Sequence, residues 1–322
     1  MQPSVAGQVS LSGRIRAHVA IARVDHWIKN VFVLPGIVIP ISITGLPSDP
    51  SFVKRLLIGL AGVSLITSSN YVINEVLDGP LDKLHPTKKN RPVPSGRVNI
   101  PVAYVQWIAL MLVGLALTSM VSWKLTAVSG ALWVMGCLYN IPPVRTKDLT
   151  YLDVITESVN NPLRLLAGWY ITTDTLVAPL SLIVSYWMVG CYFMALKRFS
   201  EYREIGKVAA AAYRRSFRFY SERSLLVSVM FYAAAAMLFF GAFIIRYRIE
   251  LVLSFPMVAA VMAIYYDLAF DENSAVQNPE HLYKEKKLMI TTVLCAVLMI
   301  GLLFVNLPAL SDTFAPTLPT GH

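Results

Sequence analysis

The stretch Asn74–Gly96, NEVLDGPLDKLHPTKKNRPVPSG, places a dense group of charges directly after a long apolar segment. It holds three acids within its first nine residues, followed by four Lys or Arg residues. The preceding segment, 53–74, is apolar and long enough to cross a bilayer as a helix, which takes about 20 residues. The stretch therefore predicts a charged site at the membrane–water boundary, where a hydrophobic helix ends.

The rest of the chain has the composition of a membrane protein. It is 56% hydrophobic and only 15% charged, with a mean hydropathy of +0.57, which is too apolar for a soluble protein of 322 residues. We therefore predict an all-α integral membrane protein with nine transmembrane helices. The longest polar interruption is 197–223, so residues 1–322 are expected to form a single membrane domain. The predicted spans are 26–45, 53–74, 101–120, 123–140, 154–173, 177–196, 224–245, 249–267 and 288–307.

The net charge of +9 is explained by membrane topology. With nine spans and a cytoplasmic N-terminus, 22 of the 28 Lys and Arg residues fall on cytoplasmic segments, as the positive-inside rule requires. The predicted localisation is therefore the inner (cytoplasmic) membrane, with several passes and no nucleic-acid partner. Residues 1–22 are expected to be a cytoplasmic N-terminal segment, and 308–322 a flexible C-terminal tail.

The acids of the opening stretch have helical spacing. Asn74, Asp78 and Asp82 recur every four residues, which places them along one face of a helix. They could be a solvated helix end, but no base lies three or four residues before either aspartate to relieve their repulsion. Two carboxylates and an amide are hard oxygen ligands, which suit Mg²⁺ bound together with substrate phosphates. The pattern thus favours a Mg²⁺ site.

The second half of the stretch is a stiff basic loop. Lys88, Lys89 and Arg91 lie between Pro86 and Pro92, and prolines restrict the backbone. Cytoplasmic loops are commonly basic, so these residues could serve topology alone. Beside a predicted Mg²⁺ site, however, Arg and Lys side chains suit the oxygens of a diphosphate.

These residues carry a family resemblance. The stretch Asn74–Gly96 resembles the NDxxDxxxD…HPxKxxRPxxxG signature of the UbiA-type membrane prenyltransferases, with Glu75 at a position where the family commonly has Asp. The segments Arg23–Gly36, RVDHWIKNVFVLPG, and Tyr139–Val154, YNIPPVRTKDLTYLDV, are also similar to family segments. The resemblance implies nine helices around a central cavity that opens to the cytoplasm.

A second motif separates the branches of this family. Members that use prenyl diphosphates usually have another acidic cluster after the sixth span, whereas this chain has Lys197, Arg198 and Glu201 there. This pattern, together with HWIKN near the start, resembles the decaprenyl-phosphate phosphoribosyltransferases. The resemblance implies phosphoribosyl pyrophosphate (PRPP) and a polyprenyl phosphate as substrates, and the extra cations suit their additional phosphates. The implied substrate-binding residues are Lys29, Lys88, Arg91, Tyr139, Lys147, Arg164, Lys197, Arg198 and Glu201.

One polar helix face is expected inside a span. Its members are Asp153, Glu157, Asn160, Asn161 and Arg164. Arg164 could pair with Asp153 or Glu157 for structural reasons, or the whole face could be cavity wall. We interpret it as cavity wall, with Asp153 holding a ribose hydroxyl or stabilising the developing cation.

The predicted reaction is Mg²⁺-dependent transfer of 5-phosphoribosyl from PRPP to a polyprenyl phosphate. Asp78, Asp82 and Asp153 are the predicted catalytic residues, and Asn74, Asp78 and Asp82 the predicted metal ligands. The nearer alternative is a prenyltransferase that moves a prenyl group from a prenyl diphosphate to an aromatic or quinone-precursor acceptor. A transporter or lipid carrier is the other alternative. The chain length of the lipid and the oligomeric state, with an oligomer possible, are left open.

Overall fold

The computed structural model describes residues 10–84, 87–277 and 279–315, and these residues form helices without any strand. Two residues of the opening motif, His85 and Pro86, lie outside this part of the chain. The α-helices are α1 (Leu11–Ile21), α2 (Leu34–Thr44), α3 (Ser51–Asp82), α4 (Ile100–Ser119), α5 (Trp123–Asn140), α6 (Leu152–Ser158), α7 (Asn160–Thr172), α8 (Leu180–Tyr213), α9 (Glu222–Tyr247), α10 (Phe255–Leu268), α11 (Lys286–Phe304) and α12 (Pro308–Thr313). The 3-10 helices are η1 (Val24–Val33), η2 (Lys88–Asn90), η3 (Thr146–Asp148), η4 (Arg215–Arg218), η5 (Ile249–Ser254), η6 (Ala275–Gln277) and η7 (Pro279–Lys284).

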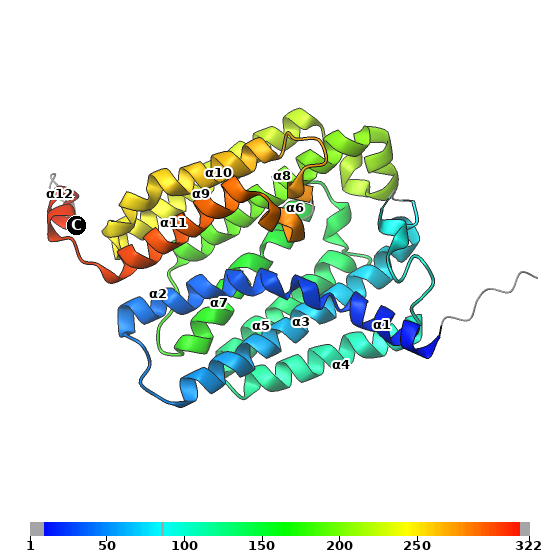
Figure 1. Cartoon of the computed structure of the whole chain (residues 1–322), viewed down its shortest axis with the longest axis horizontal. Coiled ribbons are helices and arrows are strands. Elements are labelled where there is room, and N and C mark those ends of the chain that lie inside the picture. Colours follow the sequence, from blue (N-terminus) through cyan, green and yellow to red (C-terminus); the bar gives the residue numbers. More distant parts are fainter. Residues whose placement is uncertain (1–9, 85–86, 278, 316–322) are drawn as a thin grey trace, which may run out of the picture.

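The long helices lie side by side along the long axis of the molecule (Figure 1). The loops that follow α3 and α8 are at one end, and α12 is at the other. Large apolar side chains on the outer helices are exposed, as Val105 (69%), Leu238 (69%) and Val297 (63%) illustrate. Such side chains are stable outside the core when lipid surrounds the protein. The chain is a multi-pass membrane protein.

The predicted count of nine crossings is not confirmed. Within the described residues, seven helical segments are long and apolar enough to cross a membrane, the first of them running from Ser12 to Thr44. The predicted spans 123–140 and 154–173 are helical but are not among the seven. The second of these is split into α6 and α7. Of the polar face expected there, Glu157, Asn160 and Arg164 line a cavity, whereas Asp153 and Asn161 do not. The predicted tail, 308–322, begins with the short helix α12, while 316–322 lie outside the described residues.

Close backbone contact fixes the N-terminal segment against the bundle. A Cβ at Gly36 would lie 1.8 Å from the carbonyl oxygen of Leu165, and one at Gly168 would lie 2.2 Å from that of Val33. Only glycine permits this approach of α2 and α7. The preceding η1 is tied to α3, because Trp27 Nε1 donates to Ser68 Oγ at 2.9 Å and Asn30 Nδ2 donates to Ser64 Oγ at 2.7 Å. As a result η1 forms one wall of the central cavity.

Candidate active site

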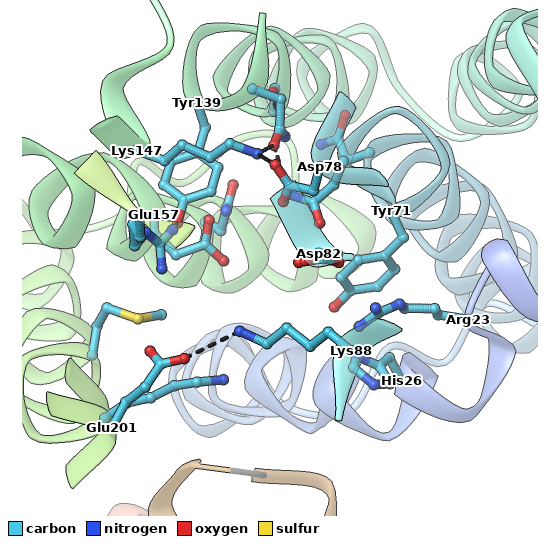
Figure 2. Close-up of a pocket in the computed structure, with 18 of the residues that line it drawn as sticks. Arg23, His26, Tyr71, Asp78, Asp82, Lys88, Tyr139, Lys147, Glu157 and Glu201 are labelled. Atoms are coloured by element: carbon cyan, nitrogen blue, oxygen red, sulfur yellow. Dashed lines mark hydrogen bonds and ion pairs between the residues drawn. The ribbon is translucent and has the colours of Figure 1, made fainter. Parts of the chain in front are cut away.

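The helices and the loops at one end of the molecule enclose a cavity of about 440 Å³. Figure 2 shows Asp78 and Asp82 between two groups of side chains, with Arg23 and Tyr71 on one side and Glu157 and Glu201 on the other. Every site residue predicted from the sequence lines this cavity except Asp153. The lining residues among them are Lys29, Asn74, Asp78, Asp82, Lys88, Arg91, Tyr139, Lys147, Arg164, Lys197, Arg198 and Glu201.

Asp78 is surrounded by positive charge. Arg145 Nη2 donates to Asp78 Oδ1 at 2.9 Å, and Lys147 Nζ donates to the same oxygen. Lys147 also donates to Asn140 Oδ1 at 2.8 Å, and the same oxygen accepts from Asn74 Nδ2 at 2.6 Å. Burial lowers the pKa of Lys147 to about 8, although the negative charge of Asp78 opposes this shift. Asn74, Asp78 and Lys147 therefore form one connected polar network.

Arg91 reaches Asp82 because its loop folds back over the end of α3. Arg91 Nη1 donates to Asp82 Oδ2 at 2.8 Å. The loop is held by Glu75, which is buried, accepts from Val93 N at 3.3 Å and pairs with Arg23 Nη2 at 3.6 Å. Glu75 does not line the cavity. The acid at this motif position thus positions the basic loop.

The basic second motif forms the opposite side of the cavity. Glu201 accepts from Lys88 Nζ at 3.1 Å and from Arg198 Nη1 at 3.4 Å. The hydroxyl of Tyr139 accepts from Arg198 Nη2 at 3.3 Å and from Arg214 Nη2 at 2.6 Å. Burial lowers the pKa of Lys88, and Glu201 opposes this shift. Helix α8 and two loops thus bring three cations, Lys88, Arg198 and Arg214, and one acid, Glu201, together on this side of the cavity.

Asp153 lies behind this cluster instead of in the cavity. Its side chain is fully buried, and its carboxylate accepts from Arg198 Nε at 3.1 Å, Ser216 Oγ at 3.2 Å and Tyr220 OH at 2.6 Å. With these three donors, the placement does not support the predicted contact with a ribose or a developing cation. It gives Asp153 a positioning role, since it joins α6, α8 and the segment around η4.

Arg164 is in the cavity wall and has no structural partner within the described residues. The side chain is buried, yet no hydrogen bond or ion pair joins it to Asp153, to Glu157 or to any other group in this part of the chain. The alternative that Arg164 pairs with Asp153 or Glu157 for structural reasons is therefore not supported.

The donor set at Asp78 and Asp82 fits a hydrated metal that arrives with a phosphate. No group of three or more His, Cys, Asp or Glu side chains suited to a metal ion occurs among the residues that the structure describes. Mg²⁺ does not need one, because it is commonly bound by one or two carboxylates together with water and substrate phosphates. Asp78, Asp82 and the amide of Asn74 are the side chains that could hold it.

Several lining residues were not predicted from the sequence. Arg145 and Arg214 contact Asp78 and Tyr139, but in the sequence they look like ordinary bases of cytoplasmic loops. Arg23 and Tyr71 form a further cationic wall, with the Arg23 guanidinium 5.8 Å and Lys29 Nζ 5.9 Å from the Tyr71 ring centre. The aromatic residue one turn before Asn74 was the available signal.

Comparisons with known proteins agree with this architecture. Residues 32–284 match the UbiA prenyltransferase family. The chain is 30% identical over 233 residues to the decaprenyl-phosphate phosphoribosyltransferase of Mycolicibacterium smegmatis, covering 70% of this chain and 68% of that protein. It is 27% identical over 163 residues to protoheme IX farnesyltransferase 2 of Vibrio parahaemolyticus, covering 49% of this chain and 56% of that protein.

The fold has a solved counterpart. The structure of a UbiA homolog from Archaeoglobus fulgidus bound to DMAPP and Mg²⁺ superposes with a TM-score of 0.69 at 19% identity, covering 92% of this chain and 99% of that one. At this identity the likeness concerns the fold alone. The family match over most of the chain and the relative at 30% identity show that the protein belongs to the UbiA prenyltransferase family and is an enzyme of that superfamily.

Proposed function

We propose that the protein transfers a 5-phosphoribosyl group from PRPP to a polyprenyl phosphate and releases pyrophosphate. The supporting observation is the charge of the cavity. Among the residues that the structure describes, the lining includes ten Lys or Arg residues and six Asp or Glu residues, but only four aliphatic side chains: Leu81, Leu132, Met194 and Ile205. A lining of this kind suits a polar donor with several phosphates better than a prenyl chain.

The residues have the following roles in this reaction. Asp78, Asp82 and Asn74 hold Mg²⁺, which neutralises charge on the pyrophosphate when bound. Arg91 and Lys88 bind pyrophosphate oxygens, and Lys29, Arg164, Lys197 and Arg198 bind the other phosphates. The C1–O bond to pyrophosphate breaks with its electron pair leaving on pyrophosphate, and an oxygen of the lipid phosphate forms the new bond to C1. Fixed cations stabilise the charge that grows on the leaving group.

The acceptor phosphate needs no general base, because it is already ionised at neutral pH. A reaction without a general base does not need a catalytic histidine. Among the lining residues of the described chain, His26 is the one histidine. That imidazole contacts Lys29 Nζ at 3.2 Å through Nδ1 and lies 3.6 Å from Asp25 through Nε2. Its position is structural in this mechanism.

A prenyl transfer to an aromatic or quinone-precursor acceptor is the second candidate. It is favoured by the farnesyltransferase relatives, and Asp78 and Asp82 would serve it equally well. The two reactions are separated by supplying membranes containing the protein with radiolabelled PRPP and a polyprenyl phosphate, or with a labelled prenyl diphosphate and 4-hydroxybenzoate. We expect label from PRPP in the lipid fraction, dependent on Mg²⁺. Consumption of the prenyl diphosphate with no use of PRPP would overturn the proposal.

We further propose that the cavity faces the cytoplasm of the inner membrane. The exposed residues Lys89 and Arg218 lie on loops at the end of the molecule that holds the cavity. The exposed residues Asp49, between α2 and α3, and Thr175, between α7 and α8, lie on loops at the opposite end. In a background without the three native cysteines, Lys89→Cys and Arg218→Cys should react with an impermeant thiol reagent only after the membrane is opened. Asp49→Cys and Thr175→Cys should react in intact cells. Labelling of Lys89→Cys from outside would contradict this orientation.

A further inference from the structure

A polar ladder crosses one wall of the cavity along α6 and α7. Glu157, Asn160 and Arg164 are three and four residues apart, and all three line the cavity. Val159, which joins the two helices, keeps helical backbone angles (φ −58°, ψ −25°), so the three side chains share one face. Figure 2 shows Glu157 on the far side of the cavity from Tyr71 and Arg23, with Asp82 between them.

Arg164 is a buried cation that lacks an anion. Its side chain is 7% exposed, and Nε is buried without a hydrogen-bond partner among the described residues. The nearest buried acid on α6, Asp153, is occupied by Arg198, Ser216 and Tyr220. A charged side chain within a membrane domain is costly and usually pairs or serves function. The missing anion is therefore expected to come from a ligand.

The other two members of the ladder are acceptors without donors. Oδ1 of Asn160 is buried and has no partner within the described part of the chain. Glu157 makes no hydrogen bond or ion pair there either, although it faces the same cavity. Buried polar atoms are normally satisfied, so the unpaired Oδ1 of Asn160 points to a missing partner, and the partly buried Glu157 faces the same space. The wall thus presents two hydrogen-bond acceptors and, one helical turn further, a cation.

We infer that Glu157, Asn160 and Arg164 form a subsite for a phosphorylated sugar, in which Glu157 and Asn160 bind hydroxyls and Arg164 binds the phosphate monoester. A prenyl chain would leave all three groups unpaired, and a lipid phosphate would satisfy Arg164 only. A sugar phosphate supplies hydroxyl donors and an anion in one molecule. The inference rests on the proposed function in that it assigns this wall to the ribose 5-phosphate half of PRPP, while Asp78 and Asp82 hold the pyrophosphate half.

Binding of ribose 5-phosphate to the purified full chain tests the subsite without requiring turnover or Mg²⁺. Titration calorimetry should show binding to the wild-type protein that is roughly 10- to 150-fold weaker in Glu157→Gln and Arg164→Gln, the usual effect of losing one charge-assisted hydrogen bond. Arg164→Lys should bind with intermediate affinity because it keeps the charge and loses the planar fork. The matched controls are Glu222→Gln and Arg223→Gln, which change exposed residues at the start of α9 and should bind normally.

Stability provides a second readout that a purely structural role would not produce. Ligand-free Arg164→Gln should have a Tm equal to or above that of the wild type, since it removes an uncompensated buried charge. A structural arginine would instead lower the Tm when replaced.

The outcomes separate this subsite from the proposed function. If PRPP is used but its KM and the ribose 5-phosphate affinity are unchanged in Glu157→Gln and Arg164→Gln, the subsite is wrong and the function stands. If PRPP is not used but ribose 5-phosphate binding is lost in both variants, the subsite stands alone. If inorganic phosphate or farnesyl monophosphate binds as tightly as ribose 5-phosphate and Glu157→Gln has no effect, the wall is a phosphate site and the sugar assignment is overturned.

Discussion

Asp82→Asn is expected to reduce kcat/KM roughly 100- to 1,000-fold, the range found when a group that stabilises transition-state charge is removed. The carboxylate is a hard ligand for Mg²⁺, and an amide in its place leaves charge on pyrophosphate uncompensated. Asp82 pairs with Arg91 at 2.8 Å, and Arg91 is partly exposed, so this variant should remain folded. The measurement is steady-state turnover in membranes, together with the elution profile of the purified protein.

Asp78→Asn should lose as much activity and also lose stability. Asp78 compensates both Arg145 and Lys147, and Lys147 is buried, so the variant leaves cations without an anion. Asp271→Asn, an exposed loop residue, is the control and should behave as the wild type. Near-normal turnover by both active-site variants, or full activity in excess chelator, would remove the metal from the mechanism.

Arg198→Ala is expected to have the second largest effect. Arg198 is 3% exposed and contacts Asp153, Glu201 and Tyr139, so its loss affects binding and folding together. Breaking a buried ion pair by removing one partner costs about 3–5 kcal/mol. We therefore expect a clear fall in Tm, and a fall in kcat/KM for PRPP of more than roughly 100-fold.

Lys197→Ala separates the two effects of the Arg198 change. Lys197 lines the cavity and is only partly buried, so its loss should weaken PRPP use roughly 10- to 150-fold with little change in Tm. Lys197→Asp should be worse, because it adds repulsion. Lys207→Ala, at an exposed position just beyond the break in α8 at Gly206, is the control. A wild-type KM for PRPP in both the Lys197 and Arg198 variants would show that the basic second motif does not bind the donor.

The sequence was sufficient for features that depend on one helix or one short loop. Apolar segments of about 20 residues predict helices in a bilayer because no other open structure satisfies the backbone there. The four-residue spacing of Asn74, Asp78 and Asp82 predicts a shared face, and the structure places all three in one cavity. The loop after α3 returns Arg91 to Asp82, only nine residues away in the chain.

The number of crossings was harder to predict because hydropathy does not distinguish a lipid-facing helix from one whose polar face lines a cavity. The segment 154–173 is helical, as predicted, but it consists of α6 and α7, with Glu157, Asn160 and Arg164 facing the cavity. These polar residues line the cavity and do not face lipid. That function could be seen only when the surrounding helices were in place.

The sequence by itself thus determined the membrane setting, the helical class and the acidic and basic motifs, since these follow from composition and from periodicity within one element. Only the tertiary structure decided that Arg145 and Lys147 pair with Asp78, 67 and 69 residues away. It also decided that the carboxylate of Asp153 has hydrogen-bond donors, whereas Nε of Arg164 has no partner among the described residues. These pairings depend on how the helices cross and rotate against one another. That geometry is set by contacts such as the backbone approach of Gly36 to Leu165, which no single-helix pattern encodes.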